Sequence, residues 1–291
     1  MNTESALAWL DDPAVPLIRH RLMAELPDRF PAEQREQAAV DAVATLPQAR
    51  DTAWMTETKG LWLIYHLLAL AECGLTRDIV DAEPAVRRVL EPPLDCGCGD
   101  ALALRALVML GWGGEPQVRE RLDAFCAHQM GDGGWFCLHR LQKRSPPKKS
   151  CYRAALHGLL LAGECAKRGV PFAGAQGVAD YFLRRNLFYR TADDSQPVLG
   201  MRPGWRVQDT FFPMETMRVG VQNIVESLCA LGHGRHPALD EAWAMLEERT
   251  DEAGRVRLDG TLQKSWLPKE NVGKPSRWVT LYAVLAERQR G

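Results

Sequence analysis

The sequence predicts an all-α protein, on three observations. The alternation of apolar and polar residues that marks a half-buried strand is nearly absent, whereas windows with the apolar spacing of a helix run through the whole chain. A pattern of apolar helix, glycine turn and proline-started helix also recurs. With 291 residues and 46% hydrophobic side chains, the chain can bury a large core, which excludes disorder and a small disulfide-stabilised scaffold.

The predicted helices have prolines and glycines at their boundaries. Proline suits the first turn of a helix and glycine the residue after its end, so these residues divide the chain into helix-sized segments. Three N-terminal helices are expected over 6–10, 13–26 and 31–43, with prolines between them. A segment dense in Leu, Trp and Ala follows, and the remaining predicted helices are 60–74, 84–90, 100–110, 116–130, 150–165, 173–186, 219–231, 237–249 and 278–289.

An internal repeat groups the later helices in pairs. LGWGGEPQV at 110–118 aligns with LGHGRHPAL at 231–239, and Gly74 followed by Pro84 is a looser copy. In each copy glycine follows an apolar helix, where a left-handed residue is needed, and proline begins the next helix. At the same offset, GGW at 133–135 aligns with GRV at 254–256. One helical hairpin cannot bury its apolar faces alone, so the hairpins are expected to stack.

The two helices of each pair differ in polarity. First helices such as 101–110 are apolar on nearly every side, while second helices such as 116–130 carry charge on one side. Buried first helices inside a layer of amphipathic second helices explain this difference, and the closed form is an α/α toroid of about six hairpins. We expect one domain over 1–291, with residues 1–45 completing or capping the ring. An open solenoid is the alternative, but it would leave the first helices partly wet.

Charge and hydropathy exclude several classes of partner. The net charge is −1 and the isoelectric point about 6.7, so no global field attracts nucleic acid or an anionic membrane. No run of 18 apolar residues is present for a transmembrane helix, and the first residues do not resemble a secretion signal. A cytoplasmic protein that binds no nucleic acid is expected, and the oligomeric state stays open.

A resemblance to a known superfamily rests on the segment 125–135, FCAHQMGDGGW. It resembles the glutamine-to-tryptophan repeat of squalene and hopene cyclases, to which the Gly-Gly-aromatic repeat of protein prenyltransferase β-subunits is related. In such a repeat, glutamine ties a helix end to the next turn, the glycines form a tight exit and tryptophan fills the gap between hairpins. ALAWLDDP at 6–13 and PSRWVTL at 275–281 resemble a group of uncharacterised bacterial prenyltransferase-like proteins. The resemblance spans most of the chain and implies a single-domain α/α toroid.

The catalytic motifs of these families are mostly missing. The cyclases protonate their substrate through Asp-x-Asp-Asp, but the pairs at 11–12 and 193–194 lack the outer aspartate. No Asp-Asp-x-x-Asp sequence is present to hold a diphosphate-bound magnesium. GCGDA at 97–101 is similar to the thioester motif of complement-type toroid proteins, but Ala101 offers no side-chain amide and excludes a thioester. The resemblance therefore informs the fold more than the reaction.

Four cysteines are candidate metal ligands. In a stack of hairpins the exit loops lie on one rim, so the thiols of these loops can converge on a zinc ion, or less readily on an iron–sulfur centre, with His139 as a further ligand. The alternative is that they are small buried side chains, as free cysteines often are. The four candidates are Cys96, Cys98, Cys137 and Cys151. The other four, Cys73, Cys126, Cys165 and Cys229, lie in helices or their caps and are interpreted as packing residues.

Polar side chains interrupt the apolar first helices and are candidate site residues. If these faces point to the toroid axis, they line a central pocket with Trp62 and Tyr65 nearby, and such a pocket suits an apolar ligand. The alternative is that they form hydrogen bonds and ion pairs inside the ring. The candidate catalytic residues are Arg153, His157 and Glu226, and the candidate ligand-binding residues are His66, Arg105, Tyr152 and Trp135; Gln222 shares a face with Glu226.

Two loops are rich in basic residues, over 139–149 and 259–277. If both lie on the cysteine-bearing rim, they give it a positive field that attracts a phosphorylated or acidic head group. Solvated loop charge is the alternative explanation.

Two functions follow from these patterns. The first is a prenyltransferase-like or terpenoid-cyclase-like protein that binds or transforms an apolar, isoprenoid ligand in the axial pocket. The second is a non-catalytic binding or scaffold toroid with a cysteine-based metal site.

Overall fold

The computed structural model describes residues 1–93, 97–136, 149–190, 193–198, 204, 206–212, 218–261 and 266–291, without the side chains of 193–195. This part of the chain is mostly helical, which confirms the predicted all-α class.

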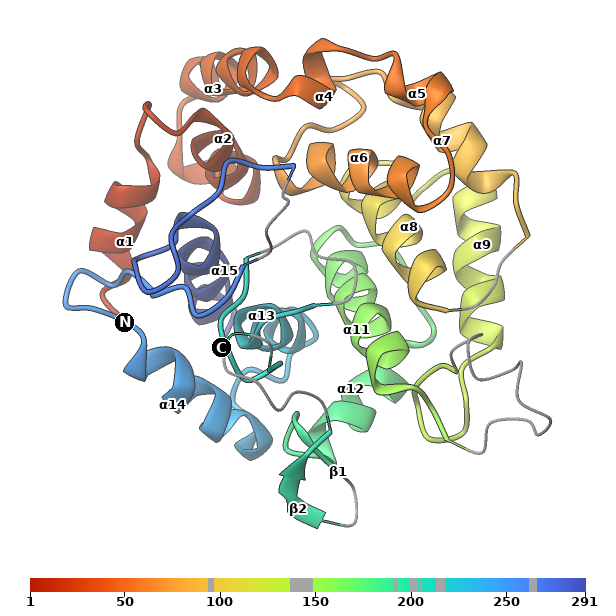
Figure 1. Cartoon of the computed structure of the whole chain (residues 1–291), viewed down its shortest axis with the longest axis vertical. Helices are drawn as coiled ribbons and strands as arrows, with labels where there is room; N and C mark the ends of the chain where they lie inside the picture. The colour runs from red at the N-terminus through yellow and green to blue at the C-terminus, as the bar shows by residue number, and fades with distance from the viewer. Residues whose placement is uncertain are drawn as a thin grey trace.

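A group of helices lies around the centre of the molecule in Figure 1. Helices α6, α8, α11, α13, α15 and α2 follow one another around this centre, and each of the first five contacts the next. These inner helices are α2 (Pro16–Glu25), α6 (Leu61–Glu72), α8 (Cys98–Met109), α11 (Tyr152–Lys167), α13 (Val221–Ala230) and α15 (Arg277–Arg288).

The remaining elements lie outside the inner helices (Figure 1). The outer helices are α1 (Thr3–Leu10), α3 (Ala32–Thr45), α4 (Pro47–Arg50), α5 (Trp54–Glu57), α7 (Glu83–Leu90), α9 (Pro116–Ala127), α12 (Ala175–Leu183) and α14 (Asp240–Glu248), with 3₁₀ turns η1 (Pro27–Arg29) and η2 (Pro237–Leu239). A short antiparallel hairpin of β1 (Tyr189–Arg190) and β2 (Asp193–Pro197) pairs Tyr189 with Pro197 at the edge of the molecule.

Burial follows this division into inner and outer helices. In α8 every residue from Ala101 to Met109 is buried, whereas α9 buries only Val118, Leu122 and Phe125. The spacing of those three residues gives a single apolar stripe, as expected of a helix with one face in water. The polarity difference in the sequence thus corresponds to inner and outer positions.

Four inner helices end in the same turn. A glycine with positive φ follows each helix, and the next residue donates its N–H to the carbonyl five residues earlier at 2.9–3.0 Å, the Schellman arrangement. The glycines are Gly74 (φ 73°), Gly111 (90°), Gly169 (63°) and Gly232 (83°). Three of these turns belong to the repeat found in the sequence, and the turn at Gly169 is a further copy that the sequence analysis missed.

The segment 125–135 forms a joint between α9, α11 and α12. Gln129 Nε2 donates to the carbonyls of Gly133 (2.8 Å) and Gly174 (2.9 Å). Trp135 is fully buried, stacks on Phe125 at 4.7 Å and donates its indole N–H to the Phe125 carbonyl at 2.9 Å. Glutamine therefore ties the helix end to the turn and tryptophan fills the gap between hairpins, as expected.

Helices α2 and α6 meet along a seam held by side chains that bond to the backbone. His20 Nδ1 donates to the Cys73 carbonyl (2.8 Å), and Arg21 Nη1 donates to the carbonyls of Ala71 (2.8 Å) and Glu72 (3.1 Å). These bonds link α2 to the C-terminal end of α6.

The predicted helices agree with the observed ones except at their ends. The sequence analysis missed α4, α5 and the β-hairpin, because one helical turn or a two-residue strand is too short to show a periodic pattern. In the part of the chain that the structure describes, no helix has the length and apolarity needed to cross a membrane.

Candidate functional site

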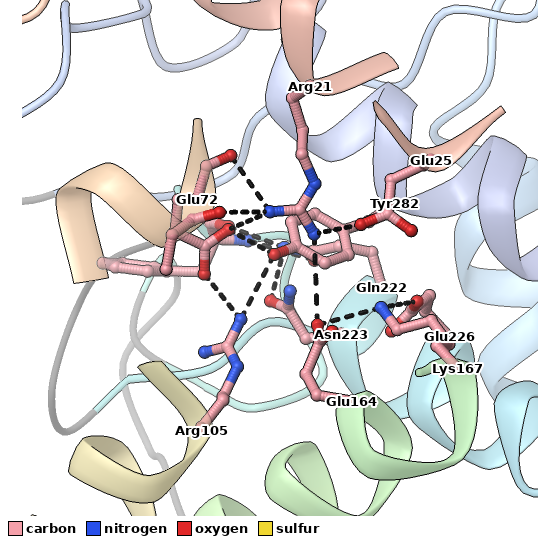
Figure 2. Close-up of polar contacts among 12 residues, drawn as sticks. Arg21, Glu25, Glu72, Arg105, Glu164, Lys167, Gln222, Asn223, Glu226 and Tyr282 are labelled. Carbon is pink, nitrogen blue, oxygen red and sulfur yellow. Dashed lines mark hydrogen bonds and ion pairs between the residues drawn. The ribbon is translucent and has the colours of Figure 1, made fainter. Parts of the chain in front are cut away.

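The six inner helices share one buried network of charged and polar side chains (Figure 2). Each helix contributes at least one member, and all these side chains are largely buried. The principal members are Arg21 and Glu25 from α2, Glu72 from α6, Arg105 from α8, Glu164 and Lys167 from α11, Glu226 from α13 and Tyr282 from α15.

One half of the network is centred on Glu72. Its carboxylate accepts from Arg105 Nη2 at 2.5 Å and from the hydroxyl of Tyr282, and Arg105 lies 3.3 Å from that hydroxyl. Arg21 Nη1 is 4.0 Å from the same carboxylate. Glu72 therefore joins α6 to α2, α8 and α15.

The other half is centred on Lys167. Its ammonium lies 2.9 Å from Glu164 and 2.5 Å from Glu226. Arg168 also pairs with Glu164 and reaches Glu25 at 3.1 Å, which connects the ends of α11 and α2. Arg21 connects this half of the network to the half centred on Glu72, because its guanidinium also lies 2.9 Å from Glu25 and 4.0 Å from Glu164.

The charges of the network balance. Four cations (Arg21, Arg105, Lys167, Arg168) face four carboxylates (Glu25, Glu72, Glu164, Glu226). A buried ion is tolerated only when it is paired in this way. Two of the predicted site residues, Arg105 and Glu226, thus take part in ion pairs between the inner helices, in line with the alternative that the sequence left open.

The carboxylates of the network differ in proton affinity. Burial alone would raise the pKa of Glu164, but the charges of Arg168, Lys167, Arg21 and Arg105 hold that pKa well below its ordinary value. Burial raises the pKa of Glu226, and the charge of Lys167, which Glu226 shares with Glu164, offsets the rise only in part. Of these two carboxylates, Glu226 thus takes up a proton more readily.

A second cluster consists of aromatic rings at the N-terminal half of α6. The His66 imidazole stacks on Trp54 with ring centroids 4.9 Å apart and lies 4.5 Å from Trp266. Trp62 lies 6.0 Å from Trp266 and 5.5 Å from Tyr65, both edge to face. We call Trp54, Trp62, Tyr65, His66 and Trp266 the aromatic cluster.

The aromatic cluster is open to solvent at one end. Trp62 is 57% exposed and Trp266 is 37% exposed, and the neighbouring Leu61 is 42% exposed. Such a grouping of exposed apolar side chains is typical of a binding surface, whereas single exposed apolar residues are common. His66 lies inside the cluster, where burial lowers its pKa, and its Nδ1 is buried without a hydrogen bond to any residue in the described ranges.

The other predicted site residues lie on or near α11. Arg153 is exposed in the first turn, and His157, one turn later on the same face, is buried. Tyr152 is also buried, where its hydroxyl donates to the Leu187 carbonyl at 2.6 Å. Trp135 is buried at the joint between hairpins, where it stacks on Phe125. The structure thus brings Arg105 and Glu226 into one network and leaves Arg153 on the surface.

The predicted metal site falls partly outside the described residues, because Cys96, Cys137 and His139 lie there. Cys98 is buried at the start of α8, and Cys151 is half-buried just before α11. Within the described ranges, no group of three or more His, Cys, Asp or Glu side chains is arranged to hold a metal ion. The four-cysteine site stays a prediction.

The cysteines interpreted as packing residues are unreactive thiols. Burial raises the pKa of Cys165 and of Cys229 to about 12, and it also raises the pKa of Cys73 and Cys126. A thiol with a raised pKa carries little thiolate at neutral pH.

Two cavities are lined by described residues. A cavity of about 280 Å³ lies between α14, α15 and Met1, and one of about 330 Å³ lies between α2, α3 and the turn after α6. Neither is lined by a residue that the sequence analysis named as a candidate site residue.

Comparison with known protein families, curated proteins and solved structures finds no match to this chain. The resemblance to squalene cyclases and prenyltransferases stays a prediction.

Sequence reasoning missed most of the network and Trp266. Glu72 and Glu164 are charges in otherwise apolar helices, and Glu164 lies seven residues after His157 on the same helix face, so the signal used for Arg105 could have identified both. Trp266 lies in the segment before α15, where no periodic pattern marks it.

Proposed function

We propose that this protein is a single α/α toroid that binds an apolar, isoprenoid-like ligand at the mouth formed by the N-terminal ends of its inner helices. The observation that carries the proposal is the exposed aromatic cluster on α6.

The toroid assignment is supported by contacts across the centre. In the order α6, α8, α11, α13, α15 and α2, helix α2 lies opposite α11, and helix α8 lies opposite α15. Arg168 of α11 nonetheless lies 3.1 Å from Glu25 of α2, and Arg105 of α8 lies 3.3 Å from Tyr282 of α15. Side chains of opposite helices meet in this way when the helices enclose a common axis.

The position of the ligand follows from the two clusters. The paired network lies beside the C-terminal halves of α6 and α11, and its charged side chains are a poor environment for an apolar ligand. On α6, Tyr65 and Trp62 precede Glu72 by seven and ten residues, which places them about 10 and 15 Å away along the helix. Ligand entry is therefore proposed at the N-terminal side.

The chemistry of this side suits an apolar ligand with an anionic head group. Exposed indole rings offer large apolar faces at little entropic cost. Arg153 is exposed at the start of α11, and a guanidinium pairs well with phosphate or carboxylate. Binding is favoured over conversion because Glu226, one of the three candidate catalytic residues, is already paired with Lys167.

The test is calorimetric titration of the purified protein with farnesol. Trp62→Ala should weaken farnesol binding by about 30-fold, the loss of a buried aromatic contact worth about 2 kcal/mol. Val40→Ser is the matched control, since Val40 is an exposed apolar residue (62%) on the outer helix α3 and should leave binding unchanged. Equal farnesol affinity in wild type and Trp62→Ala, or no binding by the wild type, would refute the proposal.

A further inference from the structure

The cavity on the outside of the α2–α6 seam has the features of a second small-molecule site. Its volume of about 330 Å³ is at the lower end of the range for ligand pockets. Its floor and walls are mainly apolar and come from α2, η1, α3 and the turn after α6, with Met23, Pro27, Ala39 and Ile79 among them. Four lining residues carry polar side-chain groups: His20, Arg35, Glu36 and Thr76.

His20 is the fixed polar group of this cavity. It is only 5% exposed, and because a carbonyl oxygen can only accept, its Nδ1 must carry the proton donated to Cys73. Burial, together with the charge of the neighbouring Arg21, lowers the pKa of His20, so the ring is neutral at pH 7 and Nε2 is a hydrogen-bond acceptor. Nε2 has no hydrogen-bond partner in the described part of the chain, and it is not sealed from solvent as His66 Nδ1 is.

The rim of the cavity offers both signs of charge. Arg35 and Glu36 are exposed neighbours on α3, and neither forms an ion pair with a described residue. The site therefore presents one cation, one anion and one buried neutral acceptor beside an apolar wall. A ligand that matches all four has a carboxylate, a positively charged donor and an apolar group.

We propose that this cavity binds a small zwitterion of the α-amino-acid class with an apolar side chain. The ammonium group donates to His20 Nε2 and Glu36, the carboxylate accepts from Arg35, and the side chain packs against Ala24, Pro27 and Ile79. The site lies on the outer side of the seam, away from the aromatic cluster, so the proposal goes beyond the ligand binding at the mouth and does not depend on it.

The experiment titrates the whole protein with L-leucine and follows the imidazole resonances of isotope-labelled histidine by NMR. Isocaproate, which lacks the amine, and isoamylamine, which lacks the carboxylate, are the matched analogues. His20→Asn identifies the His20 resonance and tests its role, because the asparagine amide can still donate to Cys73 but its shorter side chain has no atom at the position of Nε2. Arg35→Gln removes the rim cation, and Arg50→Gln, an exposed arginine on α4, is its control.

The expected result is a saturable shift of the His20 resonance by leucine with a Kd of about 1 mM or tighter. Both analogues should bind at least about tenfold more weakly, and so should leucine to His20→Asn (followed by calorimetry) and to Arg35→Gln. Arg50→Gln should bind leucine as the wild type does. No saturable shift of His20 up to about 10 mM leucine, equal binding of an analogue, or unchanged leucine affinity of His20→Asn or Arg35→Gln overturns the proposal.

Discussion

At the scale of single residues, the buried carboxylates are stable only because cations from other helices neutralise them. Glu72 is 1% exposed, and it accepts from Arg105 and Tyr282 while Arg21 lies nearby. Removing one partner of such a group leaves an uncompensated buried charge, which costs more than the pair contributes.

Glu72→Gln should therefore lower the free energy of unfolding by about 3–5 kcal/mol, because Arg105 keeps its charge and loses its partner. Urea denaturation at pH 7 measures the change. Glu252→Gln is the control, since Glu252 is exposed and its substitution should change stability by less than about 0.5 kcal/mol. Similar, small effects of both substitutions would contradict the role given to the network.

The pKa of Glu164 gives the network a defined pH dependence. Because that pKa is below its ordinary value of 4.5, the charged form stabilises the fold above pH 4.5, and this contribution is lost as the pH falls. Glu164→Gln should thus cost about 3 kcal/mol at pH 7 and progressively less below pH 4.5.

Glu226 should behave in the opposite way. Its raised pKa means that its contribution is present at low pH and is lost as the pH rises through the folded-state value. At pH 7, Glu226→Gln is therefore expected to cost less than Glu164→Gln. Urea denaturation of both variants from pH 3 to pH 8 tests this order, and a larger cost for Glu226→Gln at pH 7 would be evidence against it.

Substitution of Arg153 should distinguish binding of the ligand's anionic head group from binding of its apolar tail. Since its side chain is exposed, Arg153→Gln should leave the unfolding midpoint unchanged and weaken farnesyl diphosphate binding by about tenfold, the loss of one charged hydrogen bond. Farnesol, which has no phosphate, should bind to the variant as it does to the wild type. Calorimetric titration with both probes makes the comparison, and an equal loss for both would rule out a head-group role.

At the scale of elements, the repeated glycine turns set how inner and outer helices connect. A left-handed residue ends α6, α8, α11 and α13, and only glycine adopts that conformation without strain. These turns follow from local sequence, and for this reason the sequence predicted the helices and their pairing well. It could not predict α4 or α5, whose formation depends on packing rather than on a periodic pattern.

Gly232→Ala and Gly114→Ala form a matched pair that isolates this effect. A Cβ at either position meets no atom within 4 Å, but only Gly232 has positive φ (83°). Gly232→Ala should lower the free energy of unfolding by about 1–2 kcal/mol, and Gly114→Ala should be neutral or slightly stabilising. Equal effects in urea denaturation would show that the turn conformation does not limit stability.

At the scale of the whole molecule, paired charges link the six inner helices to one another. The sequence predicted polar groups on these helices but not how they pair, because the partners are distant along the chain; Arg168 and Glu25 are 143 residues apart. Trp266 shows the same limit, since only folding brings it to α6. Pairing between helices that are distant along the chain depends on the folded arrangement, which local patterns do not contain.

The central claim is that the inner helices enclose a common axis, and a double-mutant cycle between Glu25 and Arg168 tests it most directly. These residues lie on opposite helices, α2 and α11, 3.1 Å apart, and both are partly accessible, so the variants should fold. Urea denaturation of Glu25→Gln, Arg168→Gln and the double variant should give a coupling energy of about 1 kcal/mol. Additivity to within about 0.3 kcal/mol would mean that the two helices do not face each other, and it would contradict the closed ring.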